Sequence, residues 1–245
     1  KVVLALSGGM DSTLLLYLAA SSGEFSEIHT ITFDYGQRHK REIECAKIQI
    51  ENVAKQYNIK VTNRVLDIHY LKDITPTSSL TNLDVANPKI SEMAGDAQPS
   101  SYVPFRNMQF LAICAALAES VGAETIYYGA TKVDSLSGYF DCDENFINAM
   151  NSVISLNRKH KIVIKAPMIT MDKADIVTKS VELGIDLSNT YTCYSGEDVA
   201  DATTPASALR LKGFIDAGYK DPQQYIQQDR INTLYTEKGC RDTPK

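Results

Sequence analysis

A turn of small residues near the start of the chain has the composition of a phosphate-binding segment. The run Ser7-Gly8-Gly9-Met10-Asp11-Ser12 follows the apolar stretch Val2–Leu6 and precedes the largely apolar stretch Thr13–Leu18. This pattern predicts a buried strand, a glycine turn and the first turns of a helix. Glycines let the backbone approach an anion closely, and a helix N-terminus presents unpaired N–H groups to it. We therefore expect the turn to bind phosphate, with an ordinary structural turn as the alternative.

Asp11 indicates which phosphate chemistry this turn would serve. No Lys follows the second glycine, so the turn is not a Walker loop. A carboxylate beside a phosphate site is favourable when a divalent cation bridges the two. Such a site suits pyrophosphate as the leaving group while a substrate oxygen attacks the α-phosphorus of ATP. The expected product is an acyl or imidyl adenylate.

Three further polar segments are expected to face the same space. Phe33–His39 ends the second predicted strand, and the carboxyl ends of parallel strands face the ligand crevice. Tyr102–Asn107 places Arg106 at a helix start, where its guanidinium can clamp an anion. Asp134–Cys142 follows the fourth predicted strand and indicates a pocket for a flat, hydrogen-bonding ligand. An ordinary solvated segment is the alternative for each.

Several other reactive side chains have simpler interpretations. Lys173 begins a predicted helix, where a cation is unfavourable unless it serves an anion, so it is either a phosphate ligand or a solvated lysine. Cys142 and Cys193 have no base nearby in the sequence and are interpreted as small buried side chains. Three histidines show no ligand spacing and are interpreted as structural: His29, His69 and His160.

Alternating strands and helices must position these residues. The alternation predicts an α/β, Rossmann-like fold with a parallel sheet and helices on both faces. Irregular segments are predicted over Ile74–Ser101, as a lid or a disordered loop, and over Ala130–Asp143. After the first strand, the predicted strands are Ile28–Phe33, Val61–Leu66, Thr125–Tyr128 and Ile162–Ile164. After the first helix, the main predicted helices are His39–Tyr57, Asn107–Val121 and Asp172–Leu183.

A change of composition near Asn189 predicts a domain boundary. The chain becomes polar and irregular up to Thr203, and then Thr204-Pro205 opens a helix as N-cap and first helical residue. We therefore predict a nucleotide-binding domain over residues 1–189 and a small helical C-terminal region over residues 190–245.

Composition narrows the class of protein. The 245 residues are 44% hydrophobic, enough for a sizeable core, and the net charge of −5 disfavours direct binding to nucleic acid. The 5 cysteines have no CxxC spacing and suit a reducing compartment. No apolar run approaches the roughly 20 residues of a membrane span, and the chain opens on a core strand without a leader pattern. We expect a cytoplasmic protein with no membrane association.

Taken together, these segments resemble the 7-cyano-7-deazaguanine synthase family of ATP pyrophosphatases, known as QueC. The resemblance runs from Val3 to about Tyr219 and rests on SGGMDS, FDYGQRH, the VP-x-RN pattern, SGY-x-DC and TYTCY. It implies an adenine nucleotide alpha hydrolase-like fold and an enzyme that adenylates 7-carboxy-7-deazaguanine with ATP. Ammonia would then give an amide, and activation and dehydration of the amide would give the nitrile, with release of AMP and pyrophosphate.

The resemblance also implies roles for residues by their position. Asp11 would bind magnesium, and Lys173 and Arg106 would complete the catalytic set. The nucleotide would contact Ser7, Gly8, Gly9, Met10, Asp11, Ser12, Phe33 and Arg38. The deazapurine would contact Tyr102, Arg106, Asn107, Asp134, Ser137, Gly138, Tyr139 and Asp141.

The chain departs from the family pattern at the usual zinc site. Members usually carry four zinc cysteines, whereas here Cys193 is present and the other positions hold Asp201, Thr204 and Ser207. Tetrahedral thiolate zinc cannot be assembled from these residues, so zinc is not expected. Hydrogen bonding at the Thr204-Pro205 cap is expected to satisfy the helix start instead.

Two departures near the predicted pocket leave the acceptor open. Phe105 replaces a glycine, and Asp143 stands where the family commonly has Arg. One alternative function is therefore a ligase that adenylates the same acid and conjugates it to a protein or another amine, as in defence-associated relatives. A second is a nucleotide-binding subunit without catalysis. The source of ammonia and the oligomeric state stay open, with a homodimer among the alternatives.

Overall fold

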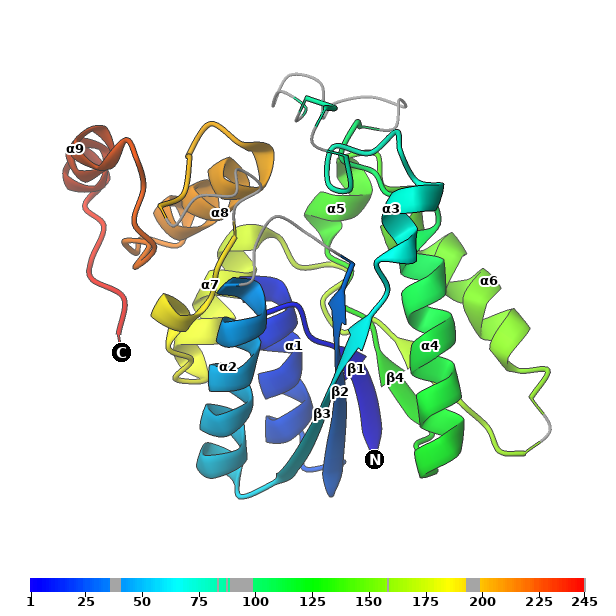
Figure 1. The fold of residues 1–245 in the computed structure, drawn as a ribbon. Coiled ribbons are helices and arrows are strands. Elements are labelled where there is room, and N and C mark those ends of the chain that lie inside the picture. The colour runs from blue at the N-terminus through cyan, green and yellow to red at the C-terminus, as the bar shows by residue number, and fades with distance from the viewer. Residues whose placement is uncertain are drawn as a thin grey trace.

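The computed structural model describes residues 1–35, 41–82, 84–86, 88, 99–157, 159–192 and 199–244. These residues form a parallel sheet with the strand order β3-β2-β1-β4-β5 and helices on both faces (Figure 1). The predicted α/β fold is therefore confirmed. The strands span Val2–Ala5 (β1), Glu27–Asp34 (β2), Lys60–Asp67 (β3), Thr125–Tyr127 (β4) and Val163–Lys165 (β5).

Helices follow the strands in the predicted order. Helices α1, α2 and α7 lie on one side of the sheet, and α4 and α6 lie on the other (Figure 1). In the described ranges, no helix is both long and apolar enough to cross a membrane. The helices span Met10–Ser21 (α1), Arg41–Tyr57 (α2), Tyr70–Ile74 (α3), Arg106–Val121 (α4), Lys132–Leu136 (α5), Glu144–Ile154 (α6), Lys173–Glu182 (α7), Pro205–Asp216 (α8) and Gln228–Lys238 (α9).

The prediction of an irregular segment over Ala130–Asp143 is wrong in part. It contains α5 and a 3-10 helix at Phe140–Cys142. Thr131 and Asp134 form a capping box, in which each side chain bonds the backbone N–H of the other residue. A helix this short shows no hydrophobic periodicity, so local hydrogen bonding decides its formation.

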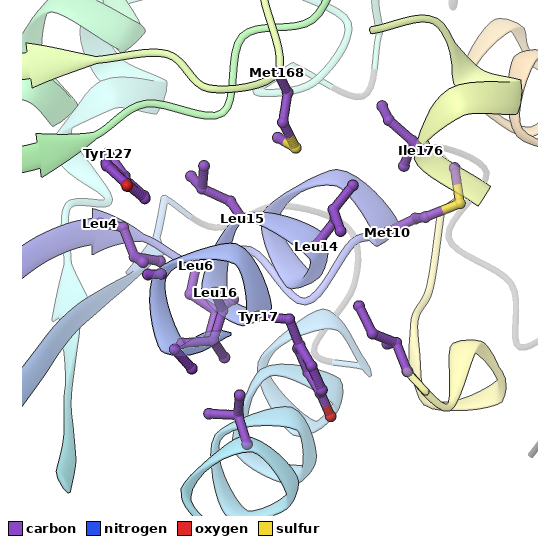
Figure 2. Close-up of a cluster of buried hydrophobic side chains, with 14 of the residues drawn as sticks. Leu4, Leu6, Met10, Leu14, Leu15, Leu16, Tyr17, Tyr127, Met168 and Ile176 are labelled. Carbon is purple, nitrogen blue, oxygen red and sulfur yellow. The ribbon is translucent and has the colours of Figure 1, made fainter. Parts of the chain in front are cut away.

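Helix α1 is apolar on every side because it is enclosed by the sheet, α2 and α7 (Figure 2). The consecutive residues Leu14, Leu15 and Leu16 are each 0% exposed. Met168 and Ile176 belong to the same buried cluster and pack around α1 (Figure 2). The turn that precedes α1 is therefore attached to the most deeply buried helix of the fold's described part.

The C-terminal region packs around a third apolar cluster. The cluster contains Leu211, Tyr225 and Tyr235, but also Cys45 of α2. Helix α8 packs closely on α7, since a Cβ added at Gly213 would lie 2.6 Å from the Lys173 Cβ. These contacts join parts of the chain before and after residue 189, and the domain boundary predicted there stays a prediction.

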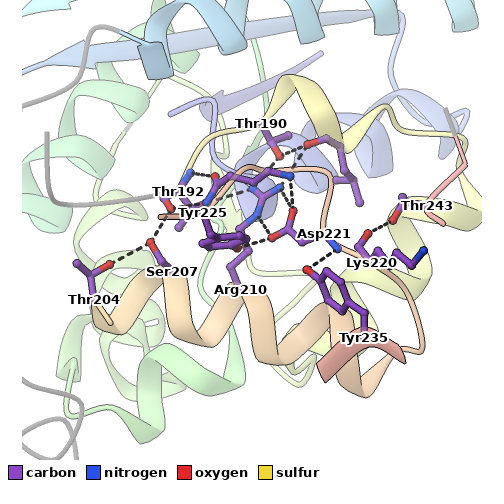
Figure 3. Close-up of polar contacts among 12 residues, drawn as sticks. Thr190, Thr192, Thr204, Ser207, Arg210, Lys220, Asp221, Tyr225, Tyr235 and Thr243 are labelled. Carbon is purple, nitrogen blue, oxygen red and sulfur yellow. Dashed lines mark hydrogen bonds and ion pairs between the residues drawn. The ribbon is translucent and has the colours of Figure 1, made fainter. Parts of the chain in front are cut away.

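A buried ion pair holds α8 in place (Figure 3). The Arg210 side chain is 1% exposed, and its Nε donates to Asp221 Oδ2 at 2.8 Å while Nη2 donates to Asp221 Oδ1 at 3.0 Å. Arg210 Nη1 also donates to Thr190 Oγ1 at 2.8 Å, and Tyr225 OH donates to Asp221 Oδ2 at 2.6 Å. Two fully buried charges are tolerable here because both are paired and hydrogen-bonded.

The helix start at Thr204-Pro205 is confirmed, but the predicted cap is wrong in one respect. Thr204 is the N-cap of α8 and Pro205 its first residue, yet the Thr204 side chain makes no capping bond. Its hydroxyl instead donates to Ser207 Oγ at 3.0 Å, and Ser207 Oγ donates to Thr192 O at 3.0 Å. These bonds tie the helix start to the segment after α7.

The Arg210–Asp221 pair leads to a stability prediction. Asp221→Asn removes the charge that pairs with a buried guanidinium, so we expect a loss of about 3–5 kcal/mol in the free energy of unfolding. The matched control is Asp216→Asn at the end of α8, where the pair with Lys212 is solvent-exposed. That change should cost about 0.5 kcal/mol or less. Urea denaturation of both variants measures the difference, and equal losses would contradict the structural role.

Candidate active site

The main cavity lies where the strand order reverses. β1 sits between β2 and β4, and the segments that follow β1 and β4 lead to opposite sides of the sheet. Such a reversal opens a crevice at the carboxyl ends of the strands. A cavity of about 290 Å³ occupies this position. It is lined by Ala5, Leu6, Ser7, Gly9, Asp11, Ser12, Phe33, Tyr35, Glu42, Leu80, Ser101, Arg106, Asn107, Phe110, Tyr128, Gly129, Ala130, Asp134, Tyr139 and Cys142.

The turn predicted to bind phosphate, residues 7–12 (the phosphate turn), is closed by its own hydroxyls. Ser7 Oγ lies 2.9 Å from Ser12 Oγ, and Gly9 N–H donates to Ser7 Oγ at 3.2 Å. Gly8 has a φ of +86°, and a Cβ added to it would lie 2.0 Å from Glu42 O on α2. Only glycine fits, because α2 approaches the turn and the backbone is left-handed.

An ion pair joins the turn to α7. Lys173 Nζ donates to Asp11 Oδ2 at 2.8 Å, and the Lys173 side chain is only 12% exposed. Burial by itself would lower the pKa of Lys173, but Asp11 and Asp134 offset it and leave the pKa above its usual value. The ammonium group is therefore charged. Asp11 Oδ1 is buried without a hydrogen-bond partner among the described residues.

Asp134 adds a second carboxylate to this group. Its Oδ2 accepts from Thr131 Oγ1 at 2.7 Å and from Thr131 N at 3.2 Å. Burial raises the pKa of Asp134, an effect that Lys173 opposes and Asp11 reinforces. Two carboxylates facing one ammonium create a place for a further cation.

Aromatic rings surround the predicted anion clamp. The Arg106 guanidinium lies 5.7 Å from the Tyr35 ring centre and 5.6 Å from that of Phe110. Phe110 stacks on Phe33 with 3.8 Å between ring centres. A cation over ring faces beside a stacked pair suits a flat ligand with an acidic substituent.

Cys142 contributes a thiol rather than a thiolate to the cavity. Burial raises its pKa, and Asp134 and Asp141 add to the effect. Its Sγ donates to Asp141 Oδ1 at 3.8 Å, and Tyr128 OH donates to Asp141 O at 2.7 Å. Cys142 is buried, as predicted, and its raised pKa disfavours a nucleophilic role.

The structure brings many of the predicted residues together, although their contacts with a ligand stay predictions. The main cavity is lined by Ser7, Gly9, Asp11, Ser12, Phe33, Arg106, Asn107, Asp134 and Tyr139. A smaller neighbouring cavity is lined by Met10, Ser137 and Lys173, together with Asp11, Asp134 and Tyr139. Neither lining includes Gly8, Tyr102, Gly138 or Asp141. Arg38 lies outside the described residues.

Sequence reasoning missed part of the cavity wall. Tyr128 directly follows β4, so the rule that carboxyl strand ends face the crevice would have found it. Phe110 lies one helical turn after Arg106 and carries no signal that separates it from a core residue. Other lining residues outside the predicted site set are Ala5, Leu6, Tyr35, Glu42, Leu80, Ser101, Gly129, Ala130 and Cys142.

The two departures near the predicted pocket have conformational explanations. Phe105 has a φ of +52°, in the left-handed region that favours glycine, and the residue is 55% exposed. Its N–H donates to Tyr102 OH at 3.0 Å. Asp143 is the N-cap of α6 and accepts from Phe146 N at 2.8 Å. Neither residue lines the main cavity.

The expected absence of zinc stays a prediction. Cys193 lies outside the described residues, and within them no group of three or more His, Cys, Asp or Glu could hold a metal. Asp201 Oδ1 accepts from Thr203 N at 2.9 Å and from Gln227 Nε2 at 2.9 Å. This carboxylate therefore takes part in a local hydrogen-bond network.

The fold and cavity define an α/β protein with a parallel sheet and helices on both faces, in which the glycine turn between the first strand and the first helix lines the cavity. A family model described as "Queuosine biosynthesis protein QueC" matches residues 1–218. The chain belongs to the QueC family, and the resemblance inferred from the motifs is confirmed.

Named relatives agree with this assignment. The chain is 39% identical over 231 residues to the 7-cyano-7-deazaguanine synthase of Clostridium kluyveri, covering 92% of this chain and 97% of that one. It is 42% identical over 227 residues to the enzyme of the same name from Campylobacter curvus, covering 92% and 97%. The structure of NMN synthetase from Francisella tularensis matches with a TM-score of 0.50 and 16% identity, covering 97% and 86%. That likeness shows a shared fold alone.

The close approach at Gly8 leads to the next prediction. Gly8→Ala places a methyl group against Glu42 O in a left-handed backbone, so we expect about 3 kcal/mol of destabilisation. Gly9→Ala is the matched control, because Gly9 has a φ of −76° and its added Cβ would come no closer than 3.4 Å to Ser7 Oγ. That variant should lose less than about 1 kcal/mol. Thermal and urea denaturation test both, and a stable Gly8→Ala protein would refute the packing argument.

Phe105 offers a test of backbone strain. Phe105→Gly should keep the stability within about 1 kcal/mol, because relief of the left-handed strain offsets the lost contact with Phe140. Phe105→Val should be less stable than Phe105→Gly by about 1–2 kcal/mol, because β-branched residues tolerate positive φ poorly. Denaturation curves compare the two. Equal stability of the glycine and valine variants would count against strain at this position.

Proposed function

We propose that this chain makes 7-cyano-7-deazaguanine from 7-carboxy-7-deazaguanine, ammonia and ATP, with AMP and pyrophosphate as the other products. The single observation that supports this most is the cavity of a QueC family member, in which the phosphate turn faces Arg106 across aromatic walls. Relatives that carry the name 7-cyano-7-deazaguanine synthase align over nearly the whole chain. We also infer a cytoplasmic enzyme that acts on a free small molecule.

The phosphate turn and Lys173 would serve the leaving pyrophosphate. Backbone N–H groups at the start of α1 favour the anion, and α1 carries no side-chain cap that would compete for them. Lys173, kept charged beside Asp11, would neutralise charge that develops as the bond from the α-phosphorus to pyrophosphate breaks.

Magnesium fits beside Asp11. Asp11 Oδ1, which is buried without a hydrogen-bond partner among the described residues, would be a hard oxygen ligand, and the Asp134 carboxyl group lies nearby. Mg²⁺ is usually held by one or two carboxylates plus substrate phosphates, so a larger cluster of protein ligands is not required. When bound, the ion would supply charge neutralisation on the phosphates of ATP.

The acid substrate would lie across the aromatic part of the cavity. Arg106 would orient the carboxylate whose oxygen attacks the α-phosphorus, and Asn107 would hydrogen-bond the heterocycle. Tyr139, held by a 2.7 Å contact with Ser101 Oγ, and Asp134 would bind from the opposite wall. Asp141 is only 2% exposed, so it would support this wall from the protein interior.

The same groups would activate the amide formed from the acid. An amide oxygen can attack a second ATP in the position that the carboxylate occupied, and loss of AMP then gives the nitrile. The sequence argument for a different acceptor is weaker now, because Phe105 and Asp143 have local structural roles. Transfer of the acyl group to a protein amine is one of the outcomes that the product analysis below distinguishes.

The test is mass spectrometry of the products. Wild-type protein should form amide and nitrile from the acid, ammonium and ATP. Lys173→Met should lower kcat/KM for ATP by about 100-fold or more, since a charge on the leaving group goes uncompensated. Lys179→Met is the control, because Lys179 lies on the same helix in an exposed pair with Glu182.

Three outcomes would contradict the proposal. Absence of amide and nitrile with wild-type protein excludes nitrile synthesis, and a mass increase on an added protein assigns the amine-ligase alternative. Equal activity of Lys173→Met and wild type removes Lys173 from the mechanism. No ATP turnover under any condition favours the non-catalytic subunit.

A further inference from the structure

A short segment after α7, residues 190–192, lies directly beside the phosphate turn. Tyr191 N–H donates to Gly8 O at 3.2 Å. A Cβ added at Gly9 would lie 3.6 Å from Tyr191 O and 3.9 Å from Thr192 Oγ1. The segment therefore lies against both glycines of the turn.

The hydrogen bond to Gly8 O fixes the direction of one peptide group in the turn. In a planar trans peptide, the C=O of one residue and the N–H of the next point in opposite directions. Because Tyr191 holds Gly8 O, the Gly9 N–H points away from Tyr191, and it donates to Ser7 Oγ at 3.2 Å. Ser7 and Gly9 both line the main cavity. The position of Tyr191 thus sets the orientation of a backbone N–H at the cavity.

The side chain of Gln223 holds this segment through both backbone groups of Thr192. Gln223 Oε1 accepts from Thr192 N at 3.0 Å, and Gln223 Nε2 donates to Thr192 O at 3.2 Å. Gln223 is buried, and its own N–H donates to Asp221 Oδ1 at 2.9 Å. At the other end of the segment, Arg210 donates to Thr190 Oγ1 (Figure 3). The C-terminal region therefore holds the segment at both ends.

The contacts of Gln223 are only partly duplicated by other side chains. Thr192 O also accepts from Ser207 Oγ at 3.0 Å. Among the described residues, however, Thr192 N–H donates to Gln223 alone. Loss of the Gln223 amide would leave this N–H without a protein partner and would weaken the attachment of Tyr191 to the turn.

We propose that Gln223 is a positioning residue for ATP binding, which acts on the phosphate turn through Thr192 and Tyr191. The inference rests on the proposed function, because it takes the phosphates of ATP as the ligand of the turn. Gln223 lines neither cavity, so its effect passes through the backbone of the segment. With Gln223 in place, the Gly9 N–H is oriented before the nucleotide arrives, and binding does not have to order the turn.

Gln223→Met tests the proposal, because methionine keeps a long, flexible side chain and removes both hydrogen bonds to Thr192. The Kd for ATP, measured by titration calorimetry with magnesium present, should rise about tenfold, which corresponds to one hydrogen bond to a charged group. The Kd for 7-carboxy-7-deazaguanine should stay within about twofold of wild type, because its predicted contacts Arg106 and Asn107 lie on α4.

Gln224→Met is the matched control. Gln224 is the next residue in the chain and is exposed, so its replacement should leave both Kd values within about twofold of wild type. Gln223→Leu removes the same two hydrogen bonds with a different side-chain shape and should also raise the Kd for ATP. Misfolding of one variant therefore does not end the test.

The two Kd values separate positioning from a general structural role. An unchanged Kd for ATP in Gln223→Met overturns the inference. An equal rise in both Kd values also overturns it, because a general loss of structure affects both ligands. If wild-type protein binds ATP but forms no amide or nitrile, the proposed function fails, while the comparison of Gln223→Met with Gln224→Met still decides the role of Gln223. A wild-type protein that binds no ATP overturns both.

Discussion

The ion pair between Asp11 and Lys173 connects the phosphate turn to the packing of the C-terminal helices. Lys173 begins α7, where Asp172 caps the helix by accepting from Ala174 N and Asp175 N at 2.9 and 3.0 Å. Helix α8 packs directly on Lys173 through Gly213, and the Arg210–Asp221 pair anchors α8. The charge that faces the turn is thus held by several independent contacts.

Charge balance is the second constraint on the site. Burial makes unpaired charges costly, and the region beside the turn brings two carboxyl groups, those of Asp11 and Asp134, close to one ammonium group. A bound cation lowers that cost. The buried Asp11 Oδ1, which has no hydrogen-bond partner among the described residues, thus supports magnesium at the phosphates in the proposed mechanism.

Strands, main helices and the phosphate turn were predictable because their signals are local. The apolar run before Ser7, the glycines and the helix start at Thr204-Pro205 are each contained within a few residues. The missed features are long-range or too short to be periodic. Helix α5 depends on one capping box, and Phe110 faces the cavity only because α4 packs where the sheet order reverses.

The order of residues alone established the α/β class, the glycine turn between the first strand and the first helix, and the family, since motif spacing carries that information within the chain. Tertiary structure decided the rest. It placed Lys173 on Asp11 across 162 positions of sequence and explained Phe105 by its positive φ. It also separated the residues that line the cavities from those that support them. These features depend on the close approach of distant elements, because side-chain distance and burial arise only when those elements pack.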